Sequence, residues 1–265
     1  MNISLYINSV FGYIVWFILE FFTNLISTAL IFAVLCAFLC AVIQGYSGFG
    51  GGLIMVPIMA LLFDPVLGIA LSALPFFLGI LLIIPRSISD VNWSEVLPLS
   101  ALSGLAILVG QNFLLSSSSQ NIKIIMGCFI VFIAILLLRN WKYTGKRNMF
   151  TSGVVGSSTG LVTGSLGIPG GPIMVMYFLS ESKQPQVQRA NILMTGFINT
   201  TVFILGFIYH GIFEQKVILQ SGILVPFFIA GSFLGQYLFV TIPTKWFLKA
   251  CSGMLILIGL IVVIA

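Results

Sequence analysis

The residues of this chain whose types and spacing suit binding chemistry are glycines that occur twice in one pattern. Residues 45–56 read GYSGFGGGLIMV and residues 164–175 read GSLGIPGGPIMV, so that Gly51 corresponds to Gly170. Glycine lets a helix break and lets a ligand approach the backbone closely. A helix that starts after such a break points free N–H groups and its positive dipole end into the break, which favours an anion. The pattern therefore predicts an anion site made from two helix breaks, without a buried Lys or Arg.

Close packing of helices through small residues is the alternative explanation of a glycine run in a membrane. Duplication at matching positions favours the binding site, because packing alone does not require two matched copies. Neither run is a nucleotide-binding loop, since no Lys-Ser/Thr pair follows and the G-x-G-x-x-G spacing is absent.

Catalytic, metal and cofactor chemistry find little support in the sequence. The single histidine, His210, is expected at a helix end, and no Asp or Glu is expected in the middle of a span. None of the four cysteines forms a C-x-x-C pair, so they are expected to pack between helices. We therefore expect no enzyme activity, no metal and no cofactor. The cysteines are Cys36, Cys40, Cys128 and Cys251.

Composition indicates a polytopic membrane protein that forms one membrane domain. The chain is 59% hydrophobic and only 6% charged, whereas soluble domains carry about a quarter charged residues. Its net charge of +5 comes from Lys and Arg in short loops, where they determine topology rather than bind nucleic acid. The first residues lack the basic region and cleavage site of a signal peptide, so none is expected.

The chain divides into two repeats. The uncharged stretches 21–63 and 148–180 are too long for one helix, and each contains one glycine motif. Further along, Gly110-Gln111 matches Gly235-Gln236. We predict an N-terminal apolar segment over 1–25, repeat 1 over 26–141, a cytoplasmic linker over 142–147 and repeat 2 over 148–265. The predicted fold class is all-α, and each repeat is a Gly-broken helix pair followed by three transmembrane helices.

Positive charges predict the orientation. With the linker in the cytoplasm and each broken pair returning to the side it entered, nine basic residues lie inside and two outside, which gives the repeats opposite orientation. The outside pair is Lys123 and Lys216, and the inside set is Arg86, Arg139, Lys142, Lys146, Arg147, Lys183, Arg189, Lys245 and Lys249.

Polar residues near the motifs complete the predicted site. Asn191, Thr195 and Asn199 share one helix face by their spacing, and substrate lining and hydrogen bonding between helices both remain open for them. The predicted substrate-binding residues are Gln44, Tyr46, Ser47, Gly48, Gly50, Gly51, Gly52, Thr163, Ser165, Gly167, Gly170, Gly171, Asn191 and Asn199.

The two motifs, with QRAN after the second, resemble the TauE/SafE sulfite exporter family, also called the toluene sulfonate uptake permease family. The resemblance covers residues 28–265 and implies a membrane carrier with two related halves. It implies a secondary transporter of a small sulfur-containing anion, sulfite or an organosulfonate, in the cell (inner) membrane. The alternative is an accessory or structural subunit of a membrane complex, which would leave the two matched motifs unexplained.

The expected partners are this anion and the lipid bilayer. The six acidic residues are expected near the ends of spans, so we predict that none is an obligatory proton carrier. Coupling to a proton or to a sodium ion stays open, as does an oligomer.

Overall fold

The computed structural model describes residues 28–47, 50–139, 143, 145, 148–168, 172–178, 185–241 and 244–264. Within these residues every regular element is helical and no strand occurs, which confirms the predicted all-α class. The predicted N-terminal segment over 1–25 lies outside the described residues.

The helices follow the predicted order, a broken pair and then three long helices, twice. Repeat 1 contains α2 (Thr28–Ser47), α3 (Gly51–Leu62), α4 (Pro65–Ile83), α5 (Trp93–Ser116) and α6 (Ser119–Leu138), with short turns η1 (Ile84–Arg86) and η2 (Ile88–Asp90) before α5. Repeat 2 contains α7 (Met149–Leu166), α8 (Pro172–Phe178), α9 (Pro185–Tyr209), α10 (Gln215–Thr241) and α11 (Thr244–Ile264).

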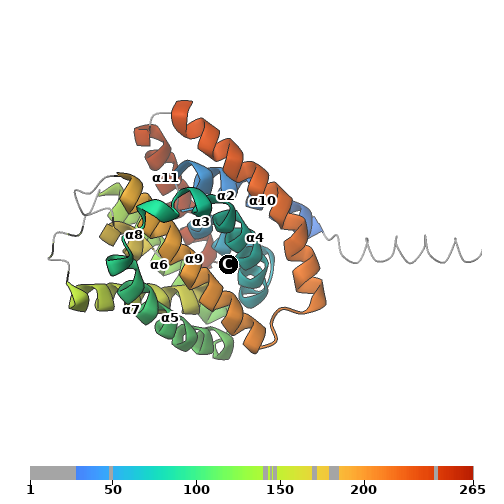
Figure 1. The fold of residues 1–265 in the computed structure, drawn as a ribbon. Coiled ribbons are helices and arrows are strands. Elements are labelled where there is room, and N and C mark those ends of the chain that lie inside the picture. Colours follow the sequence, from blue (N-terminus) through green and yellow to red (C-terminus); the bar gives the residue numbers. More distant parts are fainter. Residues whose placement is uncertain are drawn as a thin grey trace, which may run out of the picture.

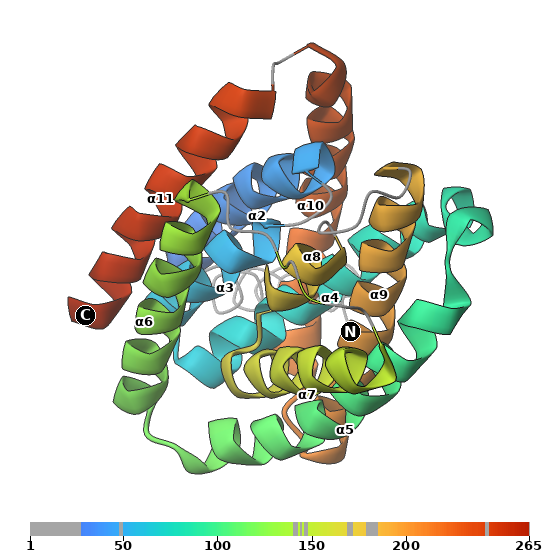
Figure 2. The same ribbon diagram turned by 90° about the vertical axis from the view of Figure 1, so that its left-hand side faces the viewer.

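Six of the described helices are long and apolar enough to cross a membrane: α2, α4, α5, α6, α9 and α10. Together they establish a multi-pass membrane protein. The short helices α3 and α8 lie inside the ring of longer helices and are largely buried (Figure 2). Helix α7 differs from the others because it is rich in Ser, Thr and Gly. This composition favours packing against other helices over contact with lipid.

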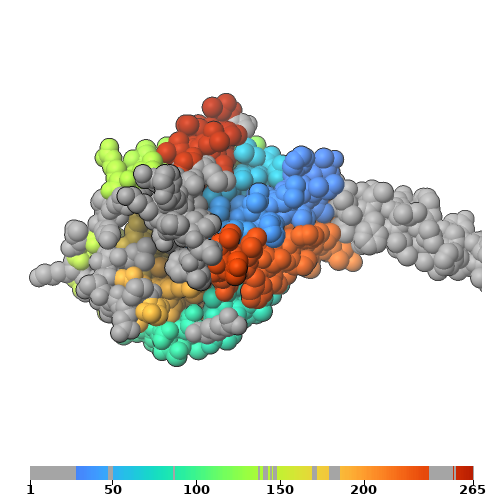
Figure 3. Space-filling model, turned by 90° about the horizontal axis from the view of Figure 1, so that it is seen from above, coloured from blue at the N-terminus to red at the C-terminus, as the bar shows by residue number. Residues whose placement is uncertain are grey.

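The two repeats pack against each other in reciprocal pairs. Helix α5 lies along α7 and α10 lies along α2, while α9 contacts α5 and α4 contacts α10 (Figures 1 and 2). The view from above shows α2 against α10 at the surface (Figure 3). Helices α6 and α11 pair with each other, as do α4 and α9. A two-fold relation between the two predicted repeats would produce this exchange; the repeats and their inverted orientation stay predictions.

Glycines bring the exchanged helices close together. On α7, Gly156, Gly160 and Gly164 each face a backbone carbonyl of α5, so a side chain at any of them would collide with that helix. On α10, Gly231 and Gly235 face carbonyls of α2 in the same way. This is the small-residue packing of membrane helices, and it places α5 and α7 in a fixed register.

Polar caps define two helix starts. Asn148 and Thr151 exchange side-chain to backbone hydrogen bonds of 2.8 and 2.9 Å at the start of α7, which is a capping box. The Asp64 carboxylate accepts from the Val66 N–H at 3.0 Å, and Pro65 occupies the first position of α4. The Asp64 carboxylate and the Asn148 amide therefore lie at the ends of helices rather than in the middle of spans.

Candidate functional site

The first helix break is closed by contacts within repeat 1. Gly50 has a left-handed backbone with φ of 91°, and α3 begins at the next residue. The Gly51 N–H donates to Gln44 Oε1 at 3.2 Å. A side chain at Gly51 would meet the Cys40 carbonyl oxygen at 2.5 Å. Because Gly51 has no side chain, α3 can approach α2 closely. In this conformation the position of a Gly51 side chain is occupied by α2 and is not open to a ligand.

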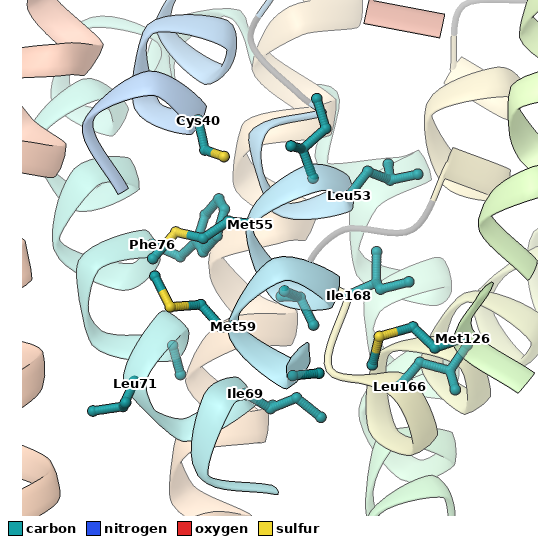
Figure 4. Close-up of a cluster of buried hydrophobic side chains, with 14 of the residues drawn as sticks. Cys40, Leu53, Met55, Met59, Ile69, Leu71, Phe76, Met126, Leu166 and Ile168 are labelled. Carbon is teal, nitrogen blue, oxygen red and sulfur yellow. The ribbon is translucent and has the colours of Figure 1, made fainter. Parts of the chain in front are cut away.

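The second break turns at Gly167, which caps α7 with φ of 68°. Its N–H donates to the Thr163 carbonyl at 2.9 Å, and a side chain there would enter the Ile69 side chain of α4. The flanking Leu166 and Ile168 pack in the same apolar cluster as Met59 of α3 (Figure 4). Only glycine fits both the backbone angle and the space, so the second break is held against repeat 1.

A small cavity lies where α7 ends beside α4 and α9. Its lining consists of Ser72, Ala73, Thr163, Gly167, Thr200 and Phe203. It has room for about one water molecule. Ser72 and Thr200 donate their hydroxyls to carbonyls of their own helices, each at 2.8 Å. The Thr163 hydroxyl has no hydrogen-bond partner among the described residues. It is therefore a free donor in this cavity, which we call the central cavity.

One face of α9 lies against α5 between Asn191 and Gly206. At one end Asn191 accepts from the Asn92 N–H at 2.8 Å and donates to a Glu95 carboxylate oxygen at 3.3 Å. At the other end Gln111 donates to the Phe203 carbonyl at 2.7 Å. Val202 lies between these ends, 3.6 Å from where a side chain at Gly104 of α5 would begin.

Thr195 and Asn199 occupy the middle of that face. Positions 191, 195, 199, 202 and 206 form one helical stripe, and the contacts at both ends show that the stripe faces α5. Thr195 and Asn199 are 0% exposed, and neither has a hydrogen-bond partner in the part of the chain that the structure describes. Both amide atoms of Asn199 are unpartnered.

Helices α5 and α7 bring further unpartnered hydroxyls to the same level. Ser100 precedes Gly104 by one turn and therefore shares the face toward α9, and Ser103 is adjacent to Gly104. On α7, Thr159 lies one turn before Thr163. All are buried and lack a partner among the described residues. We call this set the polar cluster: Ser100, Ser103, Thr159, Thr163, Thr195 and Asn199.

The polar cluster is chemically uniform. Every buried polar residue in the described ranges is a Ser, Thr, Asn or Gln, and none carries a charge. Burying a hydroxyl or amide without a hydrogen bond is unfavourable, so six such residues together call for a ligand or water. Their hydroxyl and amide hydrogens can donate to the oxygens of an anion.

Comparison with known proteins agrees with the resemblance seen in the motifs. The family model described as sulfite exporter TauE/SafE matches residues 33–262. The chain belongs to the TauE/SafE family. A relative from Cupriavidus necator named "probable sulfite/organosulfonate exporter TauE" is 25% identical over 206 residues, which is 73% of this chain and 77% of the relative. No solved structure matches. The resemblance to a family of membrane transporters is therefore confirmed.

The structure of this TauE/SafE protein separates the predicted site residues into groups. Thr163 and Asn199 belong to the polar cluster, and Gly167 lines the central cavity. Asn191 bridges α9 to the start of α5. Gln44 and Tyr46 are buried near the end of α2, Gly50 precedes α3, and Gly51 and Gly52 are its first two residues. Ser165 is half-buried and donates to the Leu161 carbonyl at 2.6 Å. The Ser47 side chain, Gly48, Gly170 and Gly171 lie outside the described residues.

Four members of the cluster were absent from the predicted site: Ser100, Ser103, Thr159 and Thr195. A lone Ser or Thr in an apolar helix carries no positional signal, because it usually bonds to its own helix. The usable signal was the glycine spacing at 156, 160 and 164, which marks the close contact with α5 and therefore the neighbourhood of Thr159 and Ser103.

Proposed function

We propose that this TauE/SafE protein is a secondary transporter of a small sulfur-containing anion, sulfite or an organosulfonate, across the inner membrane. The observation that carries the proposal is the polar cluster. Its hydroxyl and amide groups are buried among α5, α7 and α9, where each unpartnered group is destabilising unless a ligand uses it. The name of the Cupriavidus necator relative supports the substrate class.

The glycine breaks take a different role in this proposal from the one that the motifs alone suggest. Gly167 ends α7 next to Thr163, so the break shapes one wall of the central cavity. The Gly51 N–H is already bonded to Gln44 in this conformation. We propose that the substrate binds beside the second break, and that the first break becomes available only when α3 moves away from α2.

Transport then requires a conformational change. The central cavity has room for about one water molecule and no room for a sulfonate. Separation of α9 from α5 would open the polar cluster to water, and the reciprocal pair α4 and α10 would respond on the other side. Alternating movement of one repeat against the other is the usual mode of carriers with related halves.

Flux measurement in liposomes tests the proposal. Purified protein reconstituted into liposomes should accelerate the exchange of radiolabelled methanesulfonate and of sulfite relative to protein-free liposomes. An accessory subunit would incorporate equally well and show no flux. Acetate and chloride serve as anions outside the proposed class, so equal flux of all four would indicate a non-selective leak.

A further inference from the structure

In the described parts of α5, α7 and α9, charged residues lie only near the starts of the helices. The charged side chains nearest to the polar cluster along its helices are Glu95, in the first turn of α5, and Arg189, the fifth residue of α9. Arg189 is exposed, and Glu95 is half-buried and bonded to Asn191. Helix α7 contains no charged residue. From Arg189 the helix rises about 9 Å to Thr195 and about 15 Å to Asn199, so the described residues of α5, α7 and α9 place no cation beside Asn199.

Neutral donors set a limit on the charge of an anion they can hold. The cost of moving an ion from water into a medium of low dielectric constant grows with the square of its charge, so it is about four times larger for a dianion than for a monoanion. Hydrogen bonds from hydroxyls and amides offset part of that cost, but their number is the same for both ions. Sites for doubly charged ligands usually add Arg, Lys or a metal ion.

We propose that the polar cluster selects singly charged anions of the sulfonate type, including hydrogen sulfite, and rejects dianions such as sulfate. This inference rests on the proposed function and narrows its substrate class. Three equivalent sulfonate oxygens present acceptors in three directions, which suits donors that come from three helices. The Asn199 amide supplies donors from α9, and Ser103 and Thr159 supply hydroxyls from α5 and α7.

The organic part of a sulfonate has an apolar counterpart in the site. Phe203 and Ala73 line the central cavity next to Thr163. A short alkyl group directed toward them loses water without leaving a polar atom unpaired. The cluster therefore accepts a small R–SO₃⁻ ion with its oxygens toward α5 and its carbon toward α4.

Competition in liposomes tests the selection. Methanesulfonate is singly charged throughout the pH range 6–8, and sulfate is doubly charged. We expect sulfate to inhibit radiolabelled methanesulfonate exchange at least about 100-fold more weakly than unlabelled methanesulfonate does. Equal inhibition by the two anions would overturn the selection and leave anion transport standing. Absence of both methanesulfonate exchange and sulfite exchange would instead remove the proposed function and the inference together.

Sulfite provides an independent test because the dianion takes up one proton near neutral pH and becomes singly charged hydrogen sulfite. If only hydrogen sulfite binds, the half-inhibiting concentration of total sulfite should rise about tenfold per pH unit on the alkaline side. Self-inhibition by methanesulfonate should stay flat, which controls for titration of Glu95 or any other group of the protein. A sulfite curve as flat as that of methanesulfonate would contradict the proposal.

Matched variants locate the selection in the cluster. Thr195→Val keeps the shape of the side chain and removes an unpartnered hydroxyl, whereas Thr201→Val removes a hydroxyl that is bonded to the Phe197 carbonyl at 2.8 Å. We expect Thr195→Val to weaken methanesulfonate binding about tenfold or more and Thr201→Val to leave it within about twofold. Thermal unfolding without ligand checks that both variants fold. An equal effect of the two variants on binding would refute the assignment of the cluster as the site.

Discussion

Replacing Asn199 with Leu should stabilise the ligand-free protein and abolish anion binding. Asn199 is 0% exposed, and its amide oxygen and nitrogen both lack a partner among the described residues. An unsatisfied buried polar group costs about 1–3 kcal/mol. Leu has a similar volume and no polar atom, so Asn199→Leu should recover about that amount. For a protein of this size 1 kcal/mol corresponds to about 2–4 °C in the unfolding temperature, which gives an increase of about 2–12 °C.

The assay is thermal unfolding of the purified protein in detergent, followed by tryptophan fluorescence with and without methanesulfonate. Wild type should be stabilised by the ligand, because a ligand that binds only the folded state raises its stability. Asn199→Leu should start at a higher unfolding temperature and show no shift with ligand. A lower unfolding temperature of the ligand-free variant would refute the reasoning. It would mean that the Asn199 amide stabilises the helix packing and is not a vacant group available to bind an anion. Thr201→Val is the control, with little change in either quantity.

Three further predictions concern orientation, packing and coupling. In a cysteine-free background, a cysteine at Ser119 should react with an impermeant reagent from outside and one at Gly145 should not; the reverse pattern would overturn the inverted-repeat hypothesis. Gly160→Ala should prevent stable folding or lower the unfolding temperature strongly, because the new methyl would collide with the Ser103 backbone, whereas Gly222→Ala, with open space around it, should be neutral or stabilising. Glu95→Gln should retain pH-dependent sulfite exchange, and a flat profile with intact flux would show that this carboxylate carries the coupling proton.

The sequence predicted the helical architecture well for physical reasons. Stretches of apolar residues free of charge are long enough to cross a bilayer, and a stretch that is too long must contain a break. Gly50 and Gly167 are two of the positions where the backbone is left-handed, which glycine alone adopts without strain. The positions of the breaks were therefore available from residue types alone.

The roles of the glycines were harder to predict than their positions. The motif suggested a ligand near Gly51, and the structure has the Cys40 carbonyl there instead. Both situations require a residue without a side chain, so the sequence alone does not distinguish a ligand from a neighbouring helix. Close packing and site formation coexist in this fold, because the glycine contacts between α5 and α7 bring Ser103 and Thr159 to one level.

The polar cluster was only partly predictable because it depends on helix pairs distant in sequence. The spacing of Asn191, Thr195 and Asn199 correctly gave one face of α9. That face meets α5, whose Ser100 and Ser103 are about 95 positions earlier in the chain. A single sequence does not show which helix lies opposite this face. Only the structure therefore distinguishes Asn191, whose side chain is hydrogen-bonded, from Asn199, whose side chain is not.

The central claim is that the neutral cluster among α5, α7 and α9 binds the transported anion. Radiolabelled methanesulfonate exchange in liposomes that contain equal amounts of wild type and of Asn199→Leu tests it most directly. The account predicts saturable exchange by wild type that sulfate barely inhibits, and loss of this exchange in Asn199→Leu although the variant unfolds at a higher temperature. Exchange by Asn199→Leu at the wild-type rate and with the wild-type affinity would contradict it.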